Sequence, residues 1–223
     1  MVVRLWGSEM PRKFIASYTS RIVQDLVCGE LLQSQAITFH LDKPKTLRDG
    51  IESPIYIDKY KTLSHPENWR DVVDATICAI DADAFPLDFV AAVASSSAML
   101  SQAVAYRMGL PALVVSEQDW TMQEKDVSNL VKGKKVVLIE DSILTVKSVL
   151  QAVNRLREAG AIVSDIVTLT SYELPEMKKS MLDANLVLHQ VITLSEIVNR
   201  AYETKILTQD EQARVLHWIA REQ

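Results

Sequence analysis

The sequence predicts an α/β protein with a central, mostly parallel sheet flanked by helices. Apolar runs typical of buried strands alternate with segments whose apolar residues recur at helical spacing. The run at residues 136–139 is continuous and rich in β-branched residues, as in a strand buried on both faces. A helical pattern follows it and stops at Gly160. Together these features indicate strand–helix units around one sheet.

Composition narrows the class of protein. A chain of 223 residues can bury a sizeable core in one domain, and 48% hydrophobic with 24% charged residues is typical of soluble globular proteins. A net charge of −5 argues against a nucleic-acid partner, and we find no signal peptide pattern or membrane span. We therefore expect a cytoplasmic protein without a membrane partner. Cys28 and Cys78 lack metal-like spacing and are predicted to be buried.

Capping residues set the boundaries in the N-terminal part. Ser8 fits the N-cap of a first helix, and Pro11 fits its first turn. Ser64 and Glu67 have the spacing of a capping box for the next helix. Pro54 lacks a backbone donor, which places its strand at an edge or at a strand start. The predicted elements are a helix over residues 9–31, strands at 36–41 and 53–58, and a helix over 65–80.

Strands and helices alternate from residue 89 onward, which is the pattern of a parallel sheet. Thr193 with Glu196, and Thr208 with Glu211, have the spacing of capping boxes for the last two helices. Before them we predict strands at 89–94, 112–115, 136–141, 161–169 and 186–192, and helices over 98–107, 149–159 and 175–184.

Two adjacent carboxylates, Glu140 and Asp141, end the central strand. In a parallel sheet this position is the C-terminal edge, where ligands of open α/β sheets bind. The N-terminus of the following helix favours an anion. An ordinary strand–helix unit with a solvated acidic pair would show the same pattern, so both interpretations stay open.

This strand, acidic pair, loop and helix resemble the PRPP-binding motif of type I phosphoribosyltransferases. In that family the acids bind the ribose hydroxyls of PRPP, and a Thr-Thr-Gly-Gly-like loop wraps its 5′-phosphate. The resemblance implies that Glu140 and Asp141 hold the ribose. It implies a phosphate site made of Ser142, Thr145, Lys147 and Ser148.

The loop departs from the family pattern at three positions. Leu144 stands where the first Thr would be, and Val146 and Lys147 stand where the glycines would be. Glycine lets a phosphate loop adopt unusual dihedrals and approach the anion closely. Val146 is β-branched and poorly suited to a positive φ. Lys147 supplies a charge in place of an amide cradle.

Segments on both sides of this motif are similar in order to those of orotate phosphoribosyltransferases, in which an N-terminal hood covers the base. The resemblance implies that Tyr56, with Lys43 or Lys45, contacts the base; a plain hairpin packed on the core is the alternative. It also implies a pyrophosphate-binding loop after the strand at 89–94. That loop consists of Ser95, Ser96 and Ser97, which would serve equally well as helix caps.

Residues 116–123 occupy the place of the family's mobile catalytic loop, whose cations neutralise the departing pyrophosphate. Here the loop has the sequence Ser-Glu-Gln-Asp-Trp-Thr-Met-Gln, with no Arg, Lys or His. Glu117 and Asp119 would repel a pyrophosphate. Lys125 is the nearest cation and the one candidate catalytic residue of this region. In the family the loop acts across a dimer interface, so a second copy of this chain would not supply the missing charge.

The resemblance covers nearly the whole chain. It implies one domain over residues 1–223, with the N-terminal helix and hood in 1–62, the core in 63–192 and C-terminal helices in 193–223. It also implies a homodimer, a phosphoribosyl or nucleotide ligand, and Mg²⁺ that binds together with PRPP. The four histidines are scattered without metal-like spacing, so we predict no metal site made of side chains.

Three functional hypotheses remain. The first is an orotate phosphoribosyltransferase-like protein, weakly active or non-catalytic, that binds PRPP, a nucleotide or a phosphate ligand at residues 140–148. The second is an active enzyme that transfers ribose 5-phosphate from PRPP to a pyrimidine base and releases pyrophosphate. The third is a structural or partner-binding dimer without a ligand. The acidic loop beside an intact core pattern favours the first.

Overall fold

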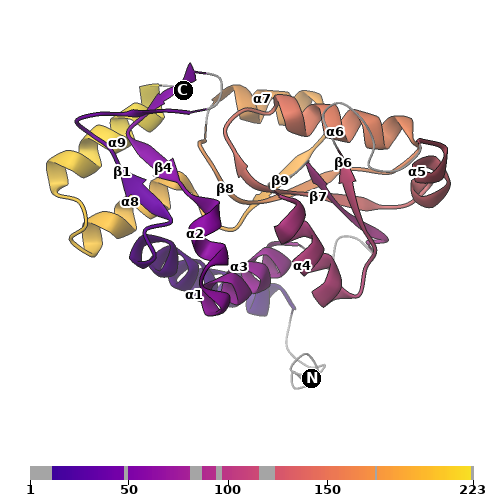
Figure 1. Cartoon of the computed structure of the whole chain (residues 1–223), viewed down its shortest axis with the longest axis horizontal. Helices are drawn as coiled ribbons and strands as arrows, with labels where there is room; N and C mark the ends of the chain where they lie inside the picture. Colours follow the sequence, from indigo (N-terminus) through magenta and orange to yellow (C-terminus); the bar gives the residue numbers. More distant parts are fainter. Residues whose placement is uncertain are drawn as a thin grey trace.

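Five parallel strands form the central sheet of the protein, in the order β6-β5-β7-β8-β9 (Figure 1). The computed structural model describes residues 12–47, 50–80, 87–93, 97–115, 124–173 and 175–221. The parallel sheet with its flanking helices confirms the predicted α/β class. The strands are β5 (Phe89–Val93), β6 (Ala112–Val115), β7 (Val136–Ile143), β8 (Asp165–Ser171) and β9 (Val187–Gln190).

Helices cover both faces of this sheet (Figure 1). The first face carries α1 (Arg12–Gln33), α3 (Pro66–Ala79) and α4 (Ala98–Met108). The second carries α5 (Glu124–Val131), α6 (Lys147–Glu158) and α7 (Pro175–Asp183). Each face therefore has its own buried apolar cluster.

The central strand β7 contributes to both clusters. Val137 and Ile139 belong to the first, and Val136 and Leu138 belong to the second. Successive side chains of a strand point to opposite faces, so this division is the geometry of a fully buried strand. It confirms the prediction made from the unbroken apolar run.

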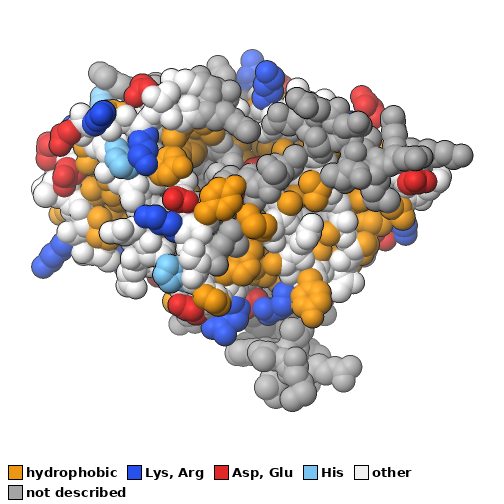
Figure 2. All heavy atoms as spheres, viewed as in Figure 1, with side chains coloured by type: hydrophobic (Ala, Val, Ile, Leu, Met, Phe, Trp, Pro, Cys, Tyr) orange, Lys and Arg blue, Asp and Glu red, His pale blue; other side chains and the backbone are white. Residues whose placement is uncertain are grey.

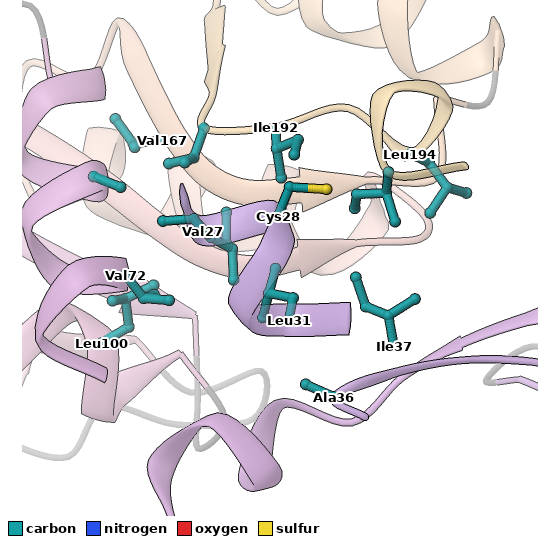
Figure 3. Packing of buried hydrophobic residues seen from close by; sticks show 14 of the residues in the cluster. Val27, Cys28, Leu31, Ala36, Ile37, Val72, Leu100, Val167, Ile192 and Leu194 are labelled. Carbon is teal, nitrogen blue, oxygen red and sulfur yellow. The ribbon is translucent and has the colours of Figure 1, made fainter. Parts of the chain in front are cut away.

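Helix α1 packs its buried side chains into the middle of the first cluster. Val27, Cys28 and Leu31 lie near Ile192 and Leu194 (Figure 3). Burial raises the pKa of the Cys28 thiol to about 12, so this cysteine behaves as a small apolar residue.

The second cysteine does not follow the prediction of burial. Cys78 is exposed. It lies on α3, whose buried stripe runs through Val72, Val73, Ala75 and Thr76, and the helical phase turns residue 78 toward solvent.

A small hood, formed by residues 37–57, lies beside the sheet. Strand β1 (Ile37–Phe39) pairs with β4 (Ile55–Ile57), and β2 (Lys45–Thr46) pairs with β3 (Glu52–Ser53). Both pairings are antiparallel. Between the two strands predicted from the sequence, the chain thus forms the additional β2–β3 pair.

The capping box predicted at Ser64 is wrong. Ser64 ends a short helix, α2 (Lys59–Leu63), and His65 precedes α3 without a side-chain capping bond. Pro66 starts α3 instead, since its fixed φ and missing N–H suit a first helical position. The sequence pattern did not predict α2 or α5. Ser8 and Pro11 lie outside the described residues.

The strand predicted at 161–169 begins later, at Asp165. Residues 161–164 cross from α6 to the sheet, with a single bridge between Lys135 and Ile162. Arg157 holds this crossing segment by donating to the carbonyl of Val163 from both Nε and Nη2.

The last two helices are α8 (Leu194–Glu203) and α9 (Gln209–Arg221), which lie on the side of the hood (Figure 1). Both predicted capping boxes are present. The Thr193 N–H donates to Glu196 at 2.8 Å, and the Glu196 N–H donates to Thr193 Oγ1 at 3.1 Å. Thr208 and Glu211 make the same pair of bonds at the start of α9. Within the described part of the chain, no helix is long and apolar enough to cross a membrane.

The contact between α1 and α3 makes stability depend on pH. Burial, followed by the neighbouring carboxyl of Asp71, raises the pKa of Glu30 from 4.5 to about 7. The folded state then binds this proton more tightly than the unfolded state. The stabilising contribution of the protonated form is present below pH 4.5 and is lost as the pH rises toward about 7.

We expect Glu30→Gln to reduce this pH dependence. Urea unfolding at several pH values should show that the wild type loses stability, relative to the variant, as the pH rises through this window. Glu158→Gln, a change at an exposed residue of α6, serves as the control and should follow the wild type. Parallel curves for wild type and Glu30→Gln would contradict the assignment.

Candidate functional site

The sheet changes direction between β5 and β7. The chain runs from β5 outward to β6 and then returns to β7 on the other side of β5. Ligands of open α/β sheets bind outside the carboxyl ends of the strands at such a switch point. Because Ala92 pairs with Ile139 and β5 ends at Val93, Glu140 and Asp141 lie at this edge.

Two predicted site residues from different motifs meet here. Ser97, which follows β5, places its Oγ 3.4 Å from Oε2 of Glu140. Glu140 is 8% exposed and Ser97 is fully buried. The predicted pyrophosphate loop and the acidic pair are thus adjacent through Ser97. Ser95 and Ser96 lie outside the described residues.

The Ser97 hydroxyl does not cap α4, as one interpretation expected. Ser97 precedes the helix with helical dihedrals, φ −81° and ψ −9°, and makes no side-chain capping bond. Its hydroxyl donates back to the carbonyl of Val93 at the end of β5. The hydroxyl therefore ties the start of α4 to the end of β5, beside Glu140.

Asp141 faces a different neighbour from Glu140, because adjacent residues of a strand point to opposite sides. It lines a cavity of about 30 Å³ together with Ser142 and with apolar side chains from α1, α3, α4 and the hood, such as Ile57 and Trp69. That volume holds about two water molecules. Asp141 is 6% exposed and accepts a bond of 2.9 Å from the Ser142 N–H. It therefore lies between the sheet edge and the hood.

The predicted phosphate loop is shorter than expected. β7 continues to Ile143, so Ser142 belongs to the strand and not to the loop, because its pairing with Thr170 of β8 extends the ladder. Thr145 lies in the remaining loop. Lys147 and Ser148 are the first two residues of α6, and Lys147 is exposed.

The backbone of this loop has no left-handed residue. Val146 precedes α6 with φ −82° and ψ −5°, and the positive-φ residues of the described chain all lie elsewhere. A negative φ is open to a β-branched side chain, whereas a positive φ would be a steric outlier. Val146, the residue before α6, has no polar side chain that could cap the helix. The first turn of α6 therefore presents its backbone N–H groups to the loop at the end of β7.

The hood brings two of the predicted base-binding residues together. Lys45 of β2 places its Nζ 4.0 Å from the ring centroid of Tyr56 of β4. This is a cation–π contact, which orients the ammonium over the ring face. Lys43 is an exposed residue of the turn before β2.

The sequence patterns did not predict an aromatic pair between the end of β8 and α9. Tyr172 directly follows β8, is 4% exposed, and donates its N–H to the carbonyl of Ile143 at 2.9 Å. Its ring meets Trp218 of α9 edge-on, with centroids 6.3 Å apart and planes at 79°. Burial, and then nearby Tyr56, raise the pKa of the Tyr172 phenol above its usual range. The sequence signal that could have indicated Tyr172 was its position as an aromatic residue directly after a buried strand.

The turn after Tyr172 is anchored to α8. Glu173 has a φ of 57°, which is uncommon for a residue with a side chain. Its carboxylate accepts bonds of 2.8 Å from both the N–H and the hydroxyl of Ser195 in the first turn of α8. These bonds hold the strained turn and, with it, the direction of Tyr172.

The predicted catalytic loop lies outside the described residues. Lys125 is the second residue of α5, which begins directly after that loop. No cluster of three His, Cys, Asp or Glu with metal-binding geometry occurs in the described ranges.

The Ser97 hydroxyl provides a test of this local geometry. We expect Ser97→Ala to lower the free energy of unfolding by about 1–2 kcal/mol, because the Val93 carbonyl loses its bond in a buried site. Ser101→Ala is a matched control on the same helix. The Ser101 hydroxyl is buried and has no hydrogen-bond partner among the described residues, so its removal should be neutral or stabilising. Equal losses in urea unfolding would refute the role given to Ser97.

Comparison with known proteins identifies close relatives over most of the chain. The orotate phosphoribosyltransferase of Coxiella burnetii is 30% identical over 190 residues, which is 84% of this chain and 91% of the relative. That of Streptococcus pneumoniae is 31% identical over 185 residues, which is 82% of this chain and 88% of the relative. No protein-family profile matches the chain.

Solved structures share the fold. The UMP synthase of Leishmania donovani superposes with a TM-score of 0.73 at 21% identity, covering 89% of this chain and 42% of that protein. The orotate phosphoribosyltransferase of Aeropyrum pernix gives 0.67 at 20% identity, covering 78% of this chain and 98% of that protein. An adenine phosphoribosyltransferase from Thermoanaerobacter pseudethanolicus gives 0.58 at 16% identity, covering 75% and 99%. The chain has the type I phosphoribosyltransferase fold and belongs to the orotate phosphoribosyltransferase family.

Proposed function

We propose that the protein binds PRPP, a nucleotide or another phosphate ligand at residues 140–148 and catalyses phosphoribosyl transfer weakly or not at all. One observation supports the proposed binding of a ligand. Two buried carboxylates, Glu140 and Asp141, lie near the C-terminal end of β7 at the switch point of the sheet, and a helix N-terminus follows after a short loop. This arrangement offers acceptors for sugar hydroxyls beside a site that favours an anion.

Each side chain has a role that its chemistry suits. Glu140 and Asp141 accept hydrogen bonds from the ribose hydroxyls. The first turn of α6 binds the 5′-phosphate through backbone N–H groups, with a charge from Lys147. Thr145 and Ser148 add hydroxyl donors, and Ser142 adds another from the end of β7. Ser95, Ser96 and Ser97 bind the pyrophosphate group of PRPP.

The limit on catalysis comes from charge. Breaking the glycosidic bond of PRPP leaves a pyrophosphate, and catalysts stabilise such developing charge with preorganised cations. Mg²⁺ bound with PRPP supplies part of this charge. Residues 116–123 contain Glu117 and Asp119 and no cation. The charge that this loop would bring to the pyrophosphate is therefore negative, where a catalyst needs a positive one. Lys125 is the nearest cationic residue in sequence.

The alternative is an active orotate-type enzyme. It is supported by the relatives named orotate phosphoribosyltransferase, which match at about 30% identity over most of the chain. Under this alternative, Lys125 and the substrate's Mg²⁺ would replace the cationic loop, and the base would lie against Tyr56 with Lys43 or Lys45.

We also propose that the chain is a single domain, that it forms a homodimer and that it is located in the cytoplasm. The face that carries α2, α3 and α4 supports the homodimer, because it offers a surface for the contact. Apolar side chains gather there (Figure 2), and Tyr60, Met99 and Tyr106 are the large exposed ones on α2 and α4. Exposed apolar surface of this kind is typical of protein contacts.

Ligand binding can be tested by thermal unfolding with PRPP and Mg²⁺, with ribose 5-phosphate, and with UMP. A ligand at 100 times its Kd should raise the Tm by roughly 5–10 °C in a chain of this size. Glu140→Gln and Asp141→Asn should abolish most of this shift, whereas Glu158→Gln, an exposed change near the end of α6, should retain it. A shift that persists in both edge variants would place the ligand elsewhere.

Turnover can be tested by following pyrophosphate release from PRPP, Mg²⁺ and orotate. We expect a rate at least about 100-fold below the roughly 10 s⁻¹ of an ordinary enzyme. Changing Glu117 and Asp119 together to Lys should raise the rate, because it restores cations beside the leaving group. The same double change at Glu158 and Asp183, which are exposed on α6 and α7, should not. Wild-type turnover in the ordinary range would favour the active enzyme.

A further inference from the structure

The strands of the hood are too short to hold themselves in place. β1 and β4 have three residues each, and β2 and β3 have two. Isolated two-stranded hairpins are marginal in water even when longer. The position of the hood therefore depends on its contacts with the rest of the molecule.

Helix α9 provides these contacts from the other end of the chain. Arg214 donates from Nη2 to the carbonyl of Leu41 at 3.0 Å, just after β1. Trp218 donates from Nε1 to the carbonyl of Glu52 in β3 at 2.9 Å. One helix thus holds both hairpins of the hood through backbone acceptors.

Trp218 also touches the sheet edge. Its ring meets Tyr172 edge-on, and the Tyr172 N–H is bonded to the carbonyl of Ile143, two residues beyond Asp141. Trp218 and Tyr172 together therefore connect β3 of the hood to the carboxyl end of β7. Aromatic pairs of this geometry are favourable beyond the burial of their surface.

On the hood side, the strand that Trp218 holds is connected to the candidate base-binding residues. Glu52 pairs with Thr46, and the Thr46 hydroxyl donates to the Glu52 carboxylate. Lys45, next to Thr46, lies over the ring of Tyr56. Displacement of β3 would therefore move Lys45 and its contact with Tyr56.

We propose that Trp218 is a positioning residue that sets the hood against the acidic edge of β7 and thereby shapes the nucleobase side of the site. This inference rests on the proposed function, because it assigns the base to the hood. The indole acts on the ligand through Glu52 and Tyr172 and does not itself touch the base. A ligand without a base should therefore be insensitive to Trp218.

Two ligands separate this role from a general loss of structure. For Trp218→Leu, isothermal titration should show about tenfold weaker binding of UMP and less than a twofold change for ribose 5-phosphate. Trp218→Phe keeps a ring for Tyr172 but loses the N–H, so it should fall between wild type and Trp218→Leu. His217→Leu, an exposed change on the same helix, should bind both ligands as the wild type does.

Hydrogen exchange tests the hood without any ligand. The N–H groups of His40 and Asp58 are bonded to Pro54 and Ala36, at the two ends of the β1–β4 pair. In Trp218→Leu these amides should exchange about tenfold faster, whereas those of β7 should be unchanged. His217→Leu should leave both sets unchanged.

The outcomes distinguish this inference from the proposed function. If the wild type binds neither ligand, the proposed function fails, and hydrogen exchange alone decides whether Trp218 holds the hood. Unchanged hood exchange in Trp218→Leu would overturn the inference. So would equal losses for UMP and ribose 5-phosphate, or faster exchange in β7, since either would mean that Trp218 supports the whole fold. Faster hood exchange with selective loss of UMP is the supporting result.

Discussion

The burial of β7 on both faces is the constraint on which the rest of the structure depends. An apolar strand enclosed by two helical layers has no freedom to shift, because a slip by one residue would exchange its faces. Near its C-terminal end the same strand carries Glu140 and Asp141, which are tolerated because they lie where the neighbouring strand β5 stops. Packing of the apolar half therefore determines where the two charges lie.

Local sequence patterns were sufficient to predict most of the fold and part of the candidate site. The unbroken apolar run predicted β7, and the Thr-x-x-Glu spacing predicted the starts of α8 and α9. The branching of Val146 predicted that this residue would not have a positive φ. Pro66 overrode the cap at Ser64, which shows that a rigid first residue can replace a polar cap.

Contacts between distant segments could not be predicted from such patterns. Ser142 continues β7 because β8 offers it a partner, and Cys78 is exposed because of the helical phase of α3. The Tyr172–Trp218 pair joins residues that no local spacing relates. The site thus combines a part encoded locally, the acidic strand and its helix, with a part that exists only once the hood has docked. The two parts can therefore change separately in sequence.

The contacts of α9 with the hood also bear on how the chain folds during synthesis. Arg214 and Trp218 are bonded to residues 173 and 166 positions earlier. Such high sequence separation makes closure slow and late, and N-terminal segments leave the ribosome first. The hood strands therefore lack these contacts until α9 has been synthesised. A nascent chain halted before α9 would carry the acidic edge without its cover.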